Sequence, residues 1–217
     1  MGHRDRDGVS AHAFERLAAA GNPPRGELLS VLGAAVDGRA VSGVVDFALD
    51  DLGRRLFGAS ATPAAEAAGR LGELLSQDPR FAIDHGDPRA LMLDWVLAQR
   101  VGHPLMLAVA MAEAGRRAGM RTGVFSSRHA WYAGVSDADG LWIVETVDRD
   151  LPHPEQLRRH CAHEIAWAAL LGLEQSYLRC GDEARAARAR RLRGILPTQH
   201  PGPAVGDPLA LLWSDSV

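Results

Sequence analysis

Cysteine and lysine are the scarce residues of this 217-residue chain, which has two cysteines and no lysine among its 24 basic residues. Long hydrophobic runs are missing too, since no apolar stretch reaches the roughly 20 residues that a membrane-spanning helix needs. The first twelve residues lack the apolar segment of a secretory signal. We therefore expect a cytoplasmic protein that does not enter membranes. In that compartment Cys161 and Cys180 are predicted to be free thiols and not a structural disulfide.

Strong charge of one sign and phosphate-binding loops are absent as well. The formal net charge is -3, which gives no reason to expect a nucleic-acid partner. Segment 182–194 is rich in arginine, but its apolar residues recur at helical spacing, which is typical of a solvated amphipathic helix. No Walker loop or Gly-x-Gly-x-x-Gly motif occurs, so we predict no cofactor. His160 and His163 are three apart on a predicted helix, but nothing nearby completes a ligand set, so we predict no metal.

Glycine and proline punctuation divides the chain into segments. The first eighty residues predict four short helices, with Ser10 as the cap of the first. A polar loop, DHGDP, then leads into an amphipathic helix, and a second helix is almost wholly apolar over Leu105 to Met111. The expected parts of one compact domain are an N-terminal helical region (1–80), a core (81–150), a C-terminal helical hairpin (151–196) and an irregular tail (197–217).

Short runs rich in β-branched and aromatic residues follow Gly119. They are RTGVFSS, HAWYAGV and LWIVETV, and the last two are joined across SDADG, a strong signal for a hairpin turn. These runs predict a small antiparallel sheet. Helical spacing returns from Pro154. The fold class is therefore α+β, with a buried helix next to a small sheet.

The stretch from Arg100 to Gly134 has the layout of a cysteine-dependent acyl-transfer site, but it contains no cysteine. In such a site the nucleophile begins a buried helix, a histidine on the adjacent strand is the base, and an acid on the next strand orients the histidine. His129 and Glu145 suit the last two roles, because they lie sixteen residues apart on strands that a tight turn joins.

With these residues, the segment from about Asp84 to Asp148 resembles the transglutaminase-like superfamily, and within it the bacterial SirB-type proteins. The similar motifs are HGDPRALMLDWVLAQRVGHPLMLAVAMAEAGRRAGM, RHAWYAGV and LWIVET, and SYLRCGDEARAARARRLRGILP looks like one truncated tetratricopeptide hairpin. The resemblance implies a papain-like core, with the family's histidine at His129 and its acid at Glu145. The position of the family's cysteine, two residues after Gly102, is taken by Pro104, as it tends to be in SirB-type relatives.

Three other side chains are candidates for chemistry at this site. Ser126 and Ser127 precede His129, and a hydroxyl from either could replace the thiol, without support from the helix dipole. His103 could approach the cleft and exchange a proton with His129 or Glu145. A polar residue that caps the helix explains His103 as well.

Four further side chains are candidates for binding. Asp84 and His85 belong to the DHGDP loop, which could border the cleft, although turn formation accounts for the Asp and Gly residues before proline. Trp131 and Tyr132 alternate about a strand, so that one faces the core and the other the opposite side. Core packing explains whichever of the two rings points inward.

Two functions follow, and a third interpretation is structural. The first is a binding or scaffold protein that lacks the nucleophile, with a small molecule or peptide in the cleft and a protein partner on the helical hairpin. The second is an enzyme of a specialised biosynthetic pathway, with His129 and Glu145 as a general acid–base pair for hydrolysis, elimination or cyclisation of a small molecule. The third makes His129 a core histidine bonded to Glu145. Cysteine-type transamidation is not expected.

Overall fold

The structure is a computed structural model, and it describes residues 4–39, 43–76, 80–127, 130–144 and 156–197. Its helices and small sheets confirm the α+β prediction. The helices are α1 (Arg4–Ala18), α2 (Arg25–Asp37), α3 (Val44–Arg55), α4 (Ala64–Ser76), α5 (Leu93–Gln99), α6 (Pro104–Arg117), α7 (Ala162–Arg179) and α8 (Glu183–Arg193), with 3-10 turns η1 (Ala59–Ala61) and η2 (Pro88–Leu91). The strands are β1 (Ala82–Ile83), β2 (Val101–Gly102), β3 (Thr122–Ser126), β4 (Trp131–Ser136), β5 (Leu141–Val144) and β6 (Arg158–His160).

The four helices predicted before residue 80 are present as α1 to α4. Their ends follow the punctuation, since Pro24 precedes α2 and Gly38 ends it in the left-handed region at φ 67°. Ser10 is a correction, because α1 begins at Arg4 and Ser10 lies inside the helix. Its hydroxyl donates to the carbonyl of Arg39 at 2.5 Å, so this serine joins α1 to the end of α2 instead of capping α1.

Helix α6 is the centre of the molecule, with every residue from Leu105 to Gly115 buried. The helix packs against α2, α3 and α5 and against strands β3 and β4. Glu113 is the one ionisable side chain in this buried stretch, and its carboxylate accepts a hydrogen bond from Nε of Arg25 at 2.9 Å. The charge is thus compensated by a partner from α2, which itself is only 13% exposed.

The main sheet has the strand order β5-β4-β3-β6, and all three pairings are antiparallel. The predicted hairpin joins β4 to β5, with Asp137 Oδ1 accepting the N–H groups of Asp139 (2.8 Å) and Gly140 (3.2 Å). Strand β6 was not predicted. It pairs Val124 of β3 with His160, where the sequence spacing favoured a continuous helix from Pro154. Strands β1 and β2 form a separate two-residue parallel pair.

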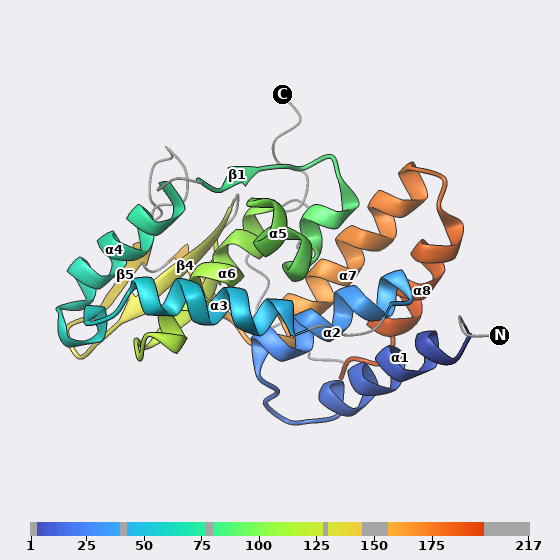
Figure 1. Cartoon of the computed structure of the whole chain (residues 1–217), viewed down its shortest axis with the longest axis horizontal. Coiled ribbons are helices and arrows are strands. Elements are labelled where there is room, and N and C mark those ends of the chain that lie inside the picture. Colours follow the sequence, from blue (N-terminus) through green and yellow to red (C-terminus); the bar gives the residue numbers. More distant parts are fainter. Residues whose placement is uncertain (1–3, 40–42, 77–79, 128–129, 145–155, 198–217) are drawn as a thin grey trace.

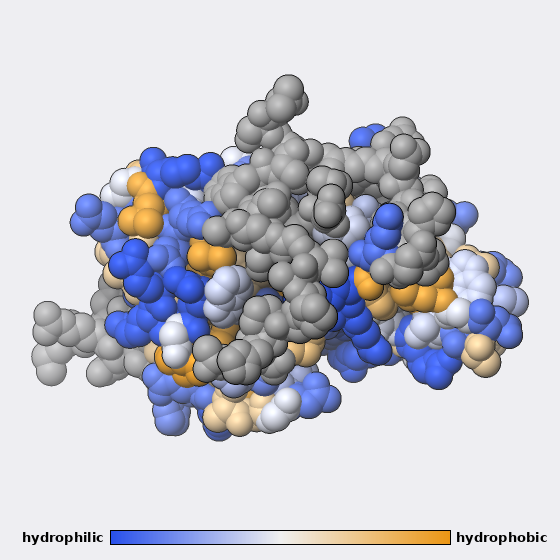
Figure 2. All heavy atoms as spheres, turned by 180° about the vertical axis from the view of Figure 1, so that it is seen from behind, coloured by the Kyte–Doolittle hydropathy of each residue, from blue (hydrophilic) through white to orange (hydrophobic). Residues whose placement is uncertain are grey.

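The elements lie in a row along the longest axis of the molecule. Figure 1 shows the sheet and α4 at one end, α6 in the middle, and α7 and α8 at the other end beside α1 and α2. In the view from behind, hydrophobic side chains occur in separate groups among hydrophilic ones (Figure 2). Within the described ranges, every helix is too short or too polar to cross a membrane.

Candidate functional site

The N-terminus of α6 is closed by its own first residues. Pro104 is the first helical residue and has no N–H group to donate. Nδ1 of His103 accepts the N–H of Leu105 at 3.2 Å, and the His103 carbonyl accepts those of Met106 at 2.8 Å and Leu107 at 3.0 Å. The donors that a helix start can offer to an oxyanion are therefore used inside the helix.

His103 is also held from the loop that precedes α5. Its backbone N–H donates to the carbonyl of Ala90 in η2 at 2.9 Å, and its ring meets the ring of His85 almost at right angles, with centroids 5.3 Å apart. The structure thus brings the predicted residues His85 and His103 together at the start of α6. They form a packed pair, and His103 is the helix cap that the sequence left open as one interpretation.

The acidic residues of the DHGDP loop shape its turns. Oδ1 of Asp84 accepts the N–H groups of Gly86 at 2.7 Å and Asp87 at 3.3 Å. Asp87 then caps η2 by accepting the N–H of Arg89 at 2.8 Å. Turn formation therefore accounts for both carboxylates, and Asp84 is separate from the pocket described below.

The predicted aromatic residues stand at the start of β4. Trp131 is buried and its ring packs against the ring of His160, with centroids 4.8 Å apart. Tyr132 is buried on the other face of the strand. Ser127 is buried next to them, and its N–H donates to the carbonyl of Ala130 at 3.0 Å. All three predicted side chains are thus part of the packed sheet end.

The predicted acid–base pair, His129 and Glu145, lies outside the described residues.

His160 and His163 do not share a helix face, which corrects the expectation for this pair. His160 ends β6, and His163 lies in α7, where its Nε2 is 3.1 Å from the carbonyl oxygen of Ala18. Cys161 and Cys180 flank α7 at its two caps and are free thiols. In the described part of the chain, no three His, Cys, Asp or Glu residues are grouped so that they could hold a metal ion.

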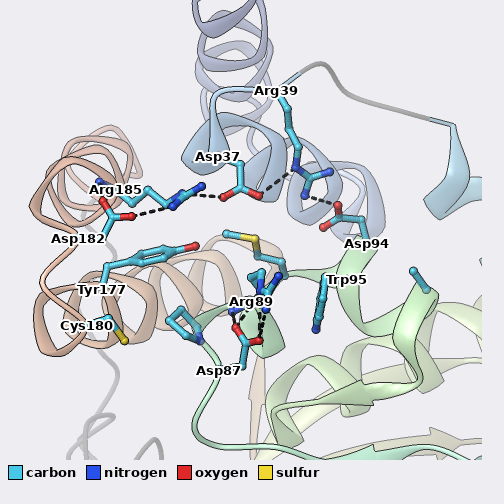
Figure 3. A pocket seen from close by; sticks show the side chains of 13 residues that line it. Asp37, Arg39, Asp87, Arg89, Asp94, Trp95, Tyr177, Cys180, Asp182 and Arg185 are labelled. Atoms are coloured by element: carbon cyan, nitrogen blue, oxygen red, sulfur yellow. Dashed lines mark hydrogen bonds and ion pairs between the residues drawn. The ribbon is translucent and has the colours of Figure 1, made fainter.

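A pocket of about 630 Å³ lies where η2 and α5 meet the hairpin of α7 and α8. Four carboxylates, three guanidinium groups and the rings of Trp95 and Tyr177 line it. Figure 3 shows that these side chains come from α2, the loop before α5, α5 itself and the α7–α8 hairpin. Volumes of roughly 300 to 1,000 Å³ are usual for small-molecule sites, so the pocket is large enough for a ligand.

One wall of the pocket is a row of alternating charges (Figure 3). Nη1 of Arg185 donates to Asp182 at 2.7 Å, and Nε of Arg185 lies 3.1 Å from Oδ1 of Asp37. The other oxygen of Asp37 accepts from Nε of Arg39 at 3.0 Å, and Arg39 continues the row to Asp94. The side chains of this row link α8 to the end of α2, and the end of α2 to α5.

A second ion pair faces this row. Arg89 donates through Nε and Nη2 to the carboxylate of Asp87, at 3.1 Å and 2.7 Å. The guanidinium also lies over the ring of Trp95, with Cζ 3.9 Å from the ring centroid. Hydrogen bonds to Arg89 lower the pKa of Asp87, so the pair is charged on both sides at neutral pH.

The arginine side chains are the more exposed partner of every pair in the pocket. The arginine side chains are 40–50% exposed, and the carboxylates are 14–31% exposed. The arginines are Arg39, Arg89 and Arg185, and the aspartates are Asp37, Asp87, Asp94 and Asp182. The arginine side chains are thus more accessible to a ligand than the aspartates, although the carboxylates outnumber the guanidinium groups.

The phenol of Tyr177 stays protonated at this position. Burial and the nearby carboxylate of Asp37 raise the pKa of Tyr177 well above its ordinary value. Its hydroxyl is therefore a neutral group that can donate or accept a hydrogen bond. Beside the ion pairs, the ring supplies an apolar wall opposite Trp95 (Figure 3).

A family model recognises the part of the chain that runs from the start of α3 through α6 and most of β3. Residues 44–125 match the family described as Transglutaminase-like superfamily. The matched, transglutaminase-like segment includes His85, His103 and Pro104, and it ends one residue before Ser126. No curated protein and no solved structure matches the chain. Both cysteines lie outside the transglutaminase-like segment.

The pocket was not found from the sequence, because no local pattern marks it. Its charged residues lie near positions 37, 90 and 180, and each cluster resembles an ordinary turn or helix end. Asp87 and Pro88 were inside the loop that the sequence singled out, and both line the pocket, so this loop links the predicted site to the pocket.

Proposed function

We propose that this protein is a ligand-binding module with a transglutaminase-like segment and without thiol chemistry. Its ligand is a small molecule or a peptide segment that carries an anionic group and a flat apolar part. The ligand occupies the pocket between η2, α5 and the α7–α8 hairpin. The observation that carries the proposal is the greater exposure of the three arginine side chains relative to their aspartate partners.

The hydrogen-bonding groups of these arginines support an anionic ligand. Each arginine places two of its three nitrogen atoms next to aspartate oxygens, although Nε of Arg185 makes an ion pair without a hydrogen bond. The third nitrogen of each is a terminal one: Nη1 of Arg39, Nη1 of Arg89 and Nη2 of Arg185. A carboxylate, phosphate or sulfonate group can accept from such a nitrogen. The aspartates hold the guanidinium planes in place, which lowers the entropy lost when a ligand binds.

The apolar part of the ligand has a matching surface. Trp95 and Tyr177 present rings, and Met92 and Pro88 complete an apolar lining. A methionine side chain adapts its shape to different partners, which suits a site for a ring or a hydrophobic side chain. Together with the guanidinium groups, this lining favours a ligand with an acid at one end and a hydrophobic body at the other.

The start of α6 argues against acyl transfer there. An acyl-transfer site needs a nucleophile and donors for the oxyanion. The residue that the resemblance puts at the nucleophile position is Pro104, and the next N–H groups are bonded to His103. Both requirements are missing at this helix start, which is why we assign binding and not thiol catalysis.

The acid–base alternative assigns chemistry to His129 and Glu145, which lie outside the described residues. Its third candidate, His103, already uses Nδ1 to cap α6. A histidine that caps a helix through one ring nitrogen is oriented by the backbone and not by a substrate. This contact favours the binding function over the enzyme.

The finer SirB-type assignment is also a proposal. In support of it, α7 and α8 are two helices joined by the short segment 180–182, and they pack against one another. Two packed helices with a short turn are the unit of a tetratricopeptide repeat. We propose that the outer surface of this hairpin receives a protein partner and that its inner end forms the ligand pocket.

A pair of probes tests the ligand class. One is 8-anilinonaphthalene-1-sulfonate, an aromatic anion whose fluorescence rises in apolar sites, and the other is N-phenyl-1-naphthylamine, its uncharged analogue. Each is titrated against the wild type, Arg89→Ala and Trp95→Ala. We expect one sulfonate site, and Arg89→Ala should weaken it by about tenfold, because one charge-assisted hydrogen bond contributes roughly 1.5 kcal/mol.

The control variant is Arg54→Ala, which also removes an exposed arginine that pairs with an aspartate, but on α3. Arg54→Ala should leave both probes unchanged, Arg89→Ala should affect the sulfonate alone, and Trp95→Ala should weaken both. The binding proposal is wrong if the sulfonate binds the wild type and Arg89→Ala equally.

A further inference from the structure

A serine, a histidine and a glutamate are connected in line at the far edge of the sheet. Ser126 is the last residue of β3, His160 is the last residue of β6, and Glu164 lies in the first turn of α7. Oγ of Ser126 is 2.6 Å from Nε2 of His160. On the other side of the ring, Nδ1 is 3.6 Å from Oε2 of Glu164. We call these three residues the serine relay.

The strand register explains why the first two side chains meet. Val124 lies opposite His160, and Ser126 lies opposite Arg158, so Ser126 and His160 are diagonal neighbours on one face of the sheet. Val124 is fully buried on that face. The hydroxyl and the imidazole therefore meet on the inner side of the sheet, and not on a solvent-facing edge.

Glu164 is fixed before it meets the histidine. Its Oε2 accepts the N–H of Cys161 at 2.9 Å in the capping box of α7, and its Oε1 receives a hydrogen bond from Arg158. Both oxygens of the Glu164 side chain therefore accept hydrogen bonds. A glutamate oxygen on the Nδ1 side favours the tautomer with a proton on Nδ1, and in that tautomer Nε2 accepts the hydrogen bond of the Ser126 hydroxyl.

This order of protons is the one that activates a serine in acyl transfer. The Nδ1–Glu164 separation exceeds a hydrogen-bond length, so the carboxylate orients the ring through electrostatic attraction. Burial lowers the pKa of His160 to about 4, while Glu164 acts in the opposite direction and Arg158 adds to the lowering. The imidazole is therefore neutral at neutral pH, which leaves one ring nitrogen with a free lone pair.

The relay is separate from the start of α6 and from the ligand pocket. His160 lies in the strand that the sequence did not reveal, and its ring packs on Trp131. The side chains of Ser126 and His160 are at most 8% exposed. A substrate for this serine must consequently be small, with a reactive carbonyl that needs little space.

We propose that Ser126 is a nucleophile for small activated esters, with His160 as its base and Glu164 as the positioning residue. In the first step the Ser126 Oγ–carbonyl carbon bond forms and the bond from that carbon to the leaving alkoxide breaks. The hydroxyl proton passes to Nε2 of His160 and then to the leaving group, which departs as the alcohol. In the second step a water attacks the acyl-serine, and the products are the carboxylic acid and the restored hydroxyl.

Covalent labelling tests the relay directly. Diisopropyl fluorophosphate phosphorylates an activated serine by forming an Oγ–P bond and releasing fluoride, and the proton leaves through the base. We expect one equivalent of label on the wild-type protein, and peptide mass spectrometry should locate it at Ser126. Ser126→Ala should take up none, and His160→Gln should be labelled at least 100-fold more slowly.

Two controls separate nucleophilic activation from a structural contact. Ser136→Ala removes another serine that ends a strand, at the opposite end of the sheet, where its hydroxyl contacts the carbonyl of Arg121. Its labelling rate should equal that of the wild type. Circular dichroism confirms that each variant is folded, and His160→Asn replaces His160→Gln if the latter is not.

The rate of labelling against pH is a further readout. Because His160 is neutral above about pH 5, the rate should be flat between pH 6 and 8. The proposal is overturned if folded wild-type protein takes up no label, or if Ser126→Ala takes up as much as the wild type. Either result would make the Ser126–His160 bond a purely structural link between β3 and β6. The outcome is independent of the sulfonate titration, since the two experiments probe different residues.

Discussion

Acidification should destabilise this protein through one histidine, His160. Its imidazole is buried at the edge of the sheet, and burial lowers its pKa from 6.5 to about 4. In the unfolded chain the same imidazole has an ordinary pKa. Between these two values the unfolded state binds more protons than the folded state, so the free energy of unfolding must fall as the pH falls. The part of the free energy of unfolding that depends on His160 is therefore fully present above pH 6.5 and decreases as the pH falls from 6.5 towards 4.

The size of the effect follows from the two pKa values. At pH 5 nearly every unfolded imidazole is protonated and nearly every folded one is neutral, so folding loses about 2 kcal/mol relative to pH 7.5. This is a large part of the stability of a small domain, which is typically about 5 to 15 kcal/mol. The charged groups that face the ring are Glu164 of α7 and Arg158 of β6, and both are included in the shift.

Urea unfolding followed by circular dichroism measures this contribution. The wild type and His160→Gln are compared at several pH values between 7.5 and 5.0, because glutamine keeps a polar group next to Ser126 but does not titrate. All other residues are the same in both proteins, so their contributions cancel in the difference. We expect the stability difference in favour of the wild type to shrink by about 2 kcal/mol on acidification. A difference that stays constant with pH would refute the burial argument.

Two further predictions concern the packing of α6. Replacing Glu113 by Ala should lower the free energy of unfolding by about 3 kcal/mol, because the buried guanidinium of Arg25 loses its partner. As a control, Glu183→Ala on the exposed start of α8 should change the free energy of unfolding by less than about 0.5 kcal/mol. Replacing Gly115 by Ala should lower the free energy of unfolding in urea by about 1 to 3 kcal/mol, although alanine is the better helix former. The reason is that the new methyl would lie 2.6 Å from Cγ2 of Thr122, whose hydroxyl is hydrogen-bonded to α6. An unchanged or raised stability would show that the strand moves aside.

The helices and the hairpin were predictable because their signals are local. Prolines and glycines mark the helix ends, and an uninterrupted apolar run predicts the burial of α6. Asp137 and Gly140 form the predicted turn between β4 and β5. In each case the residues that determine the structure are neighbours in the sequence.

Strand β6 and the pocket could not be predicted, for different physical reasons. Segment 158–160 reads Arg-Arg-His, which has no strand propensity, and it is extended because it pairs with the edge of β3. The pocket combines Asp37, Arg89 and Arg185, which come together only when the hairpin packs on α2 and η2. His129 and Glu145 stay predictions.

The position of α2 has a consequence for synthesis on the ribosome. Leu28 and Leu32 of this helix are buried, and the helix packs against α7 and α8, which are translated more than a hundred residues later. Until those helices emerge, the nascent chain carries an early helix with an uncovered apolar side. The transglutaminase-like segment is complete in sequence at residue 125, but its enclosure waits for the last helices. Truncated products of this gene should therefore be held by chaperones or degraded, rather than accumulate as an independent domain.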